Sequence, residues 1–157
     1  MSAAEDPRLP AAEGRSLPEP PSMVMRRQDV DPFDRGSGVV TLPFVGKWNC
    51  RDNHVTTGMT VFEVGTAVPM HSHNVEETVL VFEGDATAVI GGDRFDLVAG
   101  EATWVPAGVP HQFTNRGATP MTIYWVYGGR YVTRTLTATG ETFEHLSDRD
   151  RTPSAHD

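Results

Sequence analysis

Short runs of β-branched and aromatic residues, separated by glycine, proline, asparagine and aspartate, fill the chain from Gly38 onward. Many short strands with turn residues between them are typical of a β-sandwich or barrel, because α/β folds place helical patterns between their strands. Before residue 140 no segment has the i, i+3, i+4 periodicity of an amphipathic helix. Gly91 and Gly92 lie between two runs as a two-residue hairpin loop would. The runs span residues 39–45, 57–64, 78–83, 86–90, 94–98, 102–105, 112–114 and 122–127.

The two ends of the chain differ from this pattern. Six of the twelve prolines fall within residues 1–32, and apolar residues are scarce there. Such a segment buries too little surface to offset its ordering entropy, so residues 1–37 are predicted to be a flexible, extended leader, of which 1–22 are dispensable for folding. Alternating residues from Tyr131 predict a last strand. We expect the barrel to cover residues 38–137 and a polar C-terminal tail to cover 138–157.

Composition excludes several classes of partner. A chain of 157 residues is about one domain in length. Its formal net charge of −8 argues against nucleic acid, and the absence of a Lys/Arg cluster larger than Arg26-Arg27 argues against an anionic membrane surface. No apolar run approaches the roughly 20 residues of a membrane span. The single cysteine, Cys50, and an N-terminal segment without the apolar core of a signal peptide lead us to expect a cytoplasmic protein.

Two motifs carry the chemistry. Residues 65–84 have the spacing G-x5-H-x-H-x3-E-x6-G, and residues 100–115 have the spacing G-x5-P-x-G-x2-H-x3-N. On a strand, His71 and His73 point to one face, Glu77 follows at the same parity, and His111 comes from a distant strand. Burial of three imidazoles and a carboxylate without a partner would be costly. These residues therefore predict one divalent metal per chain, and the donors suit Fe, Mn, Ni, Cu or Zn.

Both motifs resemble those of the cupin superfamily at every defining position, and the resemblance covers roughly residues 57–127. Within the superfamily, the chain resembles the small, single-domain bacterial members. The resemblance implies a jelly-roll β-barrel, a metal held by His71, His73, Glu77 and His111, and a homodimer. In such a dimer Trp104 would point outward into a contact between sheets. Iron is the metal that we favour.

Other residues are weaker candidates. A substrate cavity is predicted from residues that share the inward parity or lie near the motifs: Val79, Val81, Phe113 and Met59. The alternative for each is ordinary barrel core. Tyr124, Tyr127 and Gln112 are candidate catalytic groups, and one parity of the two tyrosines should face the cavity. His54 is more typical of a surface residue.

Three functions remain open. The first is a mononuclear non-haem dioxygenase on a small aromatic or enolisable substrate. The second is a non-redox lyase, isomerase or polyketide-type cyclase, in which the metal polarises a carbonyl. The third is a ligand-binding module without turnover. A divalent ion with one carboxylate leaves a formal charge of +1, which favours an anionic oxygen as ligand. No Arg/Lys cluster flanks the motifs, which argues against phosphates and nucleotide sugars.

Overall fold

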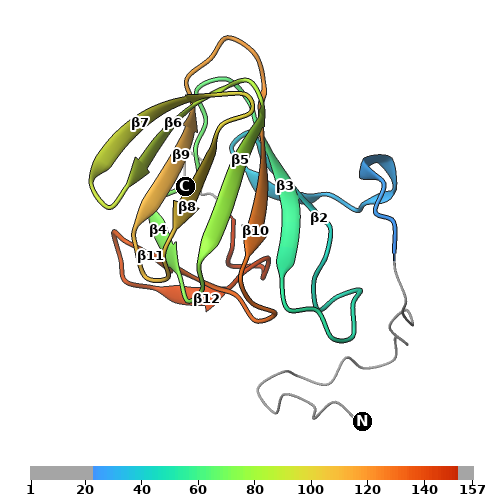
Figure 1. Cartoon of the computed structure of the whole chain (residues 1–157). Coiled ribbons are helices and arrows are strands. Elements are labelled where there is room, and N and C mark those ends of the chain that lie inside the picture. Colours follow the sequence, from blue (N-terminus) through green and yellow to red (C-terminus); the bar gives the residue numbers. More distant parts are fainter. Residues whose placement is uncertain (1–22, 152–157) are drawn as a thin grey trace.

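The computed structural model describes residues 23–151, which form two antiparallel six-stranded sheets packed face to face (Figure 1). In order across the first sheet lie β1 (Phe33–Gly36), β2 (Val39–Pro43), β3 (Thr56–Phe62), β10 (Met121–Tyr127), β5 (Glu77–Glu83) and β8 (Ala102–Val105). Across the second lie β12 (Thr142–Glu144), β11 (Thr133–Leu136), β4 (His71–His73), β9 (His111–Asn115), β6 (Asp85–Ile90) and β7 (Asp93–Val98). A short 3₁₀ helix, η1 (Arg27–Asp29), precedes β1. The predicted all-β jelly roll is confirmed.

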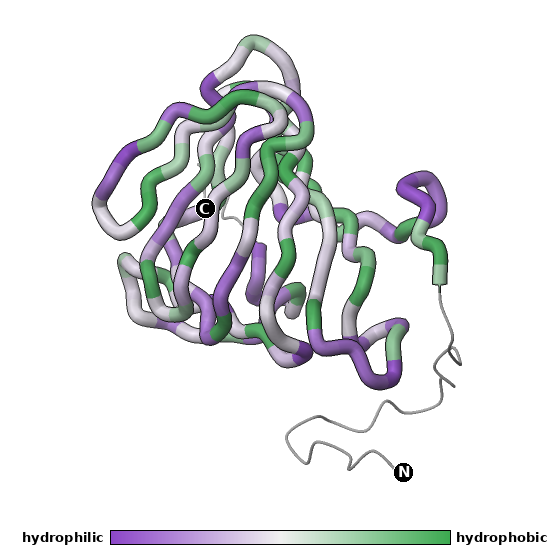
Figure 2. The backbone as a smooth tube through the Cα atoms, viewed as in Figure 1, coloured by the Kyte–Doolittle hydropathy of each residue, from purple (hydrophilic) through white to green (hydrophobic). Residues whose placement is uncertain are grey.

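The core lies between the sheets because alternate residues of each strand point inward. In β5, Glu77, Val79 and Val81 are buried, whereas Thr78 is exposed. Figure 2 shows hydrophobic residues along the strands of both sheets and hydrophilic residues between them and in the connecting loops. The buried hydrophobic cluster comprises Val39, Phe62, Val68, Val79, Val81, Ala86, Ala88, Phe113, Met121, Ile123, Trp125, Tyr127 and Val132.

The β6–β7 hairpin closes as the sequence predicts. Ile90 is the register partner of Asp93, so Gly91 and Gly92 alone form the loop. Their φ angles are 57° and 90°. A two-residue turn with two positive φ angles matches the twist of the flanking strands, and glycine adopts these angles without steric cost.

Both ends of the barrel extend past the boundaries predicted from the sequence. β1 lies inside residues 1–37, assigned to the leader, and pairs with β2. β12 lies inside residues 138–157, assigned to the tail, and pairs with β11. The buried residue of β1 is Arg35, and β12 has three residues with one buried hydrophobic side chain, Phe143, so a hydrophobic pattern reveals neither strand. The predicted dispensability of residues 1–22 falls outside the described part of the chain.

Within residues 23–151, no helix has the length and apolar composition that crossing a bilayer requires.

Candidate metal centre

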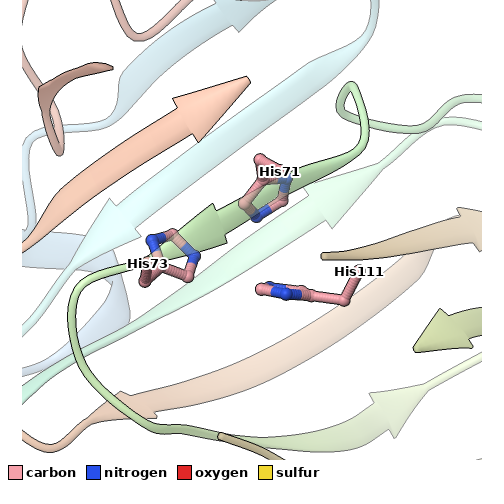
Figure 3. A group of neighbouring side chains, drawn as sticks. All are labelled: His71, His73 and His111. Carbon is pink, nitrogen blue, oxygen red and sulfur yellow. The ribbon is translucent and has the colours of Figure 1, made fainter. Parts of the chain in front are cut away.

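The four predicted ligands meet between the two sheets. His71 and His73 share the inward face of β4, and His71 is the register partner of His111, the first residue of β9. Glu77 begins β5 in the facing sheet. Their exposed fractions are 3%, 4%, 1% and 4% for His71, His73, His111 and Glu77. Figure 3 shows the three imidazole rings turned toward one another. Strand alternation therefore places the side chains as the spacing predicts.

Backbone carbonyls fix the orientation of each imidazole. The Nδ1 atoms of His71, His73 and His111 lie 2.6, 2.9 and 2.9 Å from the carbonyl oxygens of Pro69, Thr133 and Val109, respectively. A carbonyl oxygen only accepts, so each Nδ1 carries the proton and donates it. In the neutral ring, Nε2 then presents a lone pair. One ligand nitrogen from each ring lies within 4.8 Å of the others.

Burial keeps these groups in the protonation states that a metal requires. It lowers the pKa of His111 and, well below the usual value, that of His71, so both rings are neutral at neutral pH. Burial alone would raise the pKa of Glu77, but contacts with His73, His111 and the Tyr127 hydroxyl outweigh it and lower that pKa. The centre thus combines the neutral imidazoles of His71 and His111 with an ionised carboxylate.

Two of the imidazole Nε2 atoms face the two oxygens of the Glu77 carboxylate. Glu77 Oε2 lies 3.3 Å from His73 Nε2, and Glu77 Oε1 lies 3.6 Å from His111 Nε2. His111 is neutral and its Nδ1 carries the proton, so its Nε2 sets a lone pair against a carboxylate oxygen, and neither Nε2 atom has a hydrogen bond among the described residues. Such opposed acceptors are unfavourable when buried. A cation among them satisfies both, so the donor set fits a divalent metal.

A small cavity of about 30 Å³ adjoins this centre, enough for about two ordered water molecules. His71, Glu77, Tyr127 and Phe113 line it. Its remaining lining residues are Arg35, Thr60, Phe62, Val68, Ile123, Trp125 and Arg134. A substrate larger than water therefore enters only when lining side chains move.

The cavity corrects part of the sequence-based assignment. Val79 and Val81 point inward but pack in the core and do not line the cavity. Met59 is wrong as a cavity residue, because Thr60 and Phe62 take the inward parity of β3.

Of the three candidate catalytic groups, one faces the cavity and two point away from it. Tyr127 faces the cavity. Tyr124 has the outward parity of β10, and Gln112 has the outward parity of β9, where its side chain donates to Val68 O at 2.9 Å. His54 is exposed, as expected, and lies outside the centre.

A second buried polar cluster adjoins the metal ligands, and sequence reasoning missed it. Asp150 Oδ1 lies 2.7 Å from Arg35 Nη1 and 3.0 Å from Arg134 Nε. Arg35 Nη2 lies 3.4 Å from His145 Nε2. Burial would raise the pKa of Asp150, but Arg134 and Arg35 lower it to about 2. Only Arg134 left a signal in the sequence, because it shares the inward parity of Val132.

Comparison with known proteins agrees with this geometry. Residues 58–127 match the family model described as a cupin domain. The chain contains a cupin domain. Among curated relatives, the cupin is 28% identical over 102 residues to the HTH-type transcriptional regulator PuuR of Escherichia coli, which covers 64% of this chain and 54% of the regulator. It therefore spans about half the length of that relative. It is also 36% identical over 50 residues to quercetin 2,3-dioxygenase of Bacillus subtilis, covering 31% of this chain and 15% of the dioxygenase.

Solved structures share the fold of this cupin. The polyketide cyclase RemF from Streptomyces resistomycificus superposes with a TM-score of 0.59 and 20% identity. The match covers 68% of this chain and 78% of the cyclase. At such identity the likeness concerns the fold alone.

Proposed function

We propose that this cupin binds one divalent metal through His71, His73, His111 and Glu77 and acts as a metal-dependent dioxygenase. Its substrate would be a small molecule that binds as an oxygen anion. The observation that carries the proposal is a buried set of converging side chains, in which Nε2 of His73 and of His111 faces the Glu77 carboxylate without a hydrogen bond. The partial likeness to quercetin 2,3-dioxygenase supports the oxidative reaction.

Residues around the site orient the imidazoles and exclude water from the cavity. A redox-active ion such as iron, when bound, would supply a Lewis acid and electron exchange with O₂ or substrate. The carbonyls of Pro69, Thr133 and Val109 hold the imidazoles in place, which reduces the reorganisation that binding requires. Phe113, Ile123 and Trp125 supply an apolar wall that excludes water.

A non-redox lyase, isomerase or cyclase is the second candidate, and Tyr127 is the observation that favours it. Burial, followed by the charge of Glu77, raises the pKa of Tyr127 well above its usual value. The phenol is therefore protonated at neutral pH and faces the cavity, where it can donate a proton to a substrate. The shared fold with a polyketide cyclase is consistent with this chemistry.

The metal ion that supports turnover distinguishes the two candidate functions. Protein purified without oxygen would first be analysed for bound metal, then stripped and reconstituted to equal occupancy with Fe²⁺ or Zn²⁺. A screen of phenolic and diketone compounds would follow O₂ consumption and product formation. Zn²⁺ has no accessible redox change, so only the iron form should turn over if the protein is a dioxygenase. Full turnover of the zinc form without O₂ would instead favour the second candidate. Tight binding without turnover in either form would indicate a binding module.

A further inference from the structure

Two arginines from outside the cupin motifs line the same cavity as the metal ligands. Arg35 comes from β1 and Arg134 from β11, and their exposed fractions are 2% and 4%. Arg134 is the register partner of His73 in the β11–β4 pairing, so the arginine lies next to the metal centre. The fold therefore creates a cationic wall that the spacing of the motifs does not reveal.

Arg35 is fully engaged in structural contacts. Its Nε donates to Thr41 Oγ1 at 2.7 Å, and its Nη1 donates to Asp150 Oδ1 at 2.7 Å and to the Asp150 carbonyl at 3.1 Å. Its Nη2 contacts His145 Nε2. Burial lowers the pKa of His145 well below its usual value, so this ring is neutral and accepts from the arginine. Arg35 joins β1 to the end of the described chain.

Arg134 has fewer polar contacts than Arg35, so N–H donors of its guanidinium group remain without a hydrogen-bond partner among the described residues. Its Nε lies 3.0 Å from Asp150 Oδ1 in an ion pair, yet this buried nitrogen makes no hydrogen bond. Within residues 23–151, this ion pair is the described polar contact of its guanidinium group. The other Asp150 oxygen, Oδ2, already accepts from the backbone nitrogen of Leu146 at 2.8 Å. The planar fork of the guanidinium therefore remains available on the cavity side.

The charges of this cluster do not balance. Arg35 and Arg134 carry two positive charges, and Asp150 carries one negative charge. Guanidinium groups stay protonated in proteins, so a buried surplus of positive charge is costly unless an anion compensates it. A structural ion pair needs only Arg35 and Asp150. Glu77, the second carboxylate that lines the cavity, balances the charge of Arg134 until a divalent cation binds beside Glu77, and the surplus positive charge then lies at the cavity wall.

We propose that Arg134, supported by Arg35, binds a carboxylate group of the substrate. A carboxylate presents two oxygens in one plane, which matches the two Nη groups of a guanidinium. Because the arginine lies opposite His73 and the cavity is small, the oxygen that reaches the metal is only a few bonds from that carboxylate. The substrate class is therefore a short organic acid with a second, ionisable oxygen. This class rests on the proposed metal-dependent function, whereas anion binding by Arg134 does not.

The test measures anion binding without the metal. Full-length, ¹⁵N-labelled protein stripped of metal is titrated with sodium formate, and the Arg134 Nε–Hε signal is followed by NMR at constant ionic strength set with sodium chloride. Formamide, which has nearly the same shape but no charge, is titrated in parallel. We expect saturable shifts with formate and none with formamide. Equal shifts with both probes, or none with formate, would overturn the proposal.

Two variants assign the binding to Arg134. In Arg134→Gln, formate affinity measured by calorimetry should fall about tenfold or more, because a charge-assisted pair is lost. Arg35 still pairs with Asp150 in this variant, so folding should be preserved. Arg116→Gln is the matched control, since Arg116 lies on the surface and donates to the carbonyls of Ala86 and Leu97. Unchanged affinity in Arg134→Gln, or an equal loss in Arg116→Gln, would contradict the proposal.

Two further measurements distinguish failure of the carboxylate site from failure of the proposed metal-dependent function. If Arg134→Gln does not fold, Arg134→Lys keeps the charge but loses the planar fork, and its affinity for formate should still fall. Metal stoichiometry is measured on the same samples. Formate binding without metal binding would refute the proposed function and retain the carboxylate site. Metal binding without formate binding would do the reverse.

Discussion

Tyr127 and Glu77 are register partners across β10 and β5, and the Tyr127 hydroxyl lowers the pKa of the Glu77 carboxyl. This relationship connects a proposed metal ligand to a buried phenol in the same sheet. The imidazoles of His73 and His111 lower the pKa of Glu77 as well. Partners of this kind orient metal ligands, and their loss typically weakens metal affinity by about 10- to 100-fold.

Substitution of Tyr127 by phenylalanine should therefore weaken metal binding by about tenfold. Because the hydroxyl lowers the pKa of Glu77, its removal should also shift the pH dependence of metal binding to higher pH. Competition with a chromophoric chelator at several pH values measures both effects. Tyr124→Phe is the control, since Tyr124 lies on the outward face of the same strand. Identical affinities for the two variants would contradict the role of the Tyr127 hydroxyl.

Loss of any one imidazole should abolish stoichiometric metal binding. We expect His71→Gln, His73→Gln and His111→Gln each to lower affinity by more than about 100-fold, because a direct ligand contributes more than its hydrogen-bond partners do. Metal content after dialysis and the metal-induced rise in melting temperature are the measurements. His54→Gln, at an exposed position, should behave as the wild type. A histidine variant that retains one metal per chain would remove that residue from the ligand set.

Asp150 should stabilise the fold in a pH-dependent manner. Its pKa is lowered from 3.8 to about 2, so its stabilisation is fully present above pH 3.8 and is lost as the pH falls through about 2. Above that window, wild type should exceed Asp150→Asn by about 2 kcal/mol in free energy of unfolding, since the residue is buried. Urea unfolding between about pH 6 and pH 2 measures the difference. A difference that stays constant over this range would show that the Asp150 charge does not contribute.

Exposed apolar residues suggest where two copies meet. Trp104 on β8 is 61% exposed, and Phe82, Phe95 and Val98 on β5 and β7 are each 46% exposed. Such side chains favour association, and we expect a homodimer that contacts Trp104. Trp104→Ser should shift the mass measured by sedimentation velocity from dimer to monomer. Trp48→Ser, which alters a tryptophan in the β2–β3 connection, is the control. A monomeric wild type at high concentration would contradict this expectation.

Short motifs with strand parity were sufficient to predict which side chains lie together at the candidate site. His71, His73, Glu77 and His111 converge because alternation on strands converts spacing into direction. The runs of β-branched residues likewise predicted most of the strands.

The cationic wall could not be predicted in this way. Arg35, His145 and Asp150 lie in segments of low hydrophobicity at the two ends of the barrel, and their burial depends on mutual pairing across the fold. Met59 shows the opposite error, because its apolar character suggested a cavity position while the parity of β3 placed it outward. Sequence spacing thus locates groups within one strand pair, whereas long-range charge pairing requires the tertiary structure.

The Arg35–Asp150 contact also determines when this end of the barrel can form during synthesis. The two residues are 115 positions apart in the chain, and Arg134 too is made before Asp150. A nascent chain emerges with its N-terminal part first, so both guanidinium groups are synthesised before the carboxylate that compensates their charge. Contacts across such a long separation form slowly, because the intervening chain must first be ordered. The cavity that Arg35 and Arg134 line is therefore completed after the strands that carry His71, His73, Glu77 and His111.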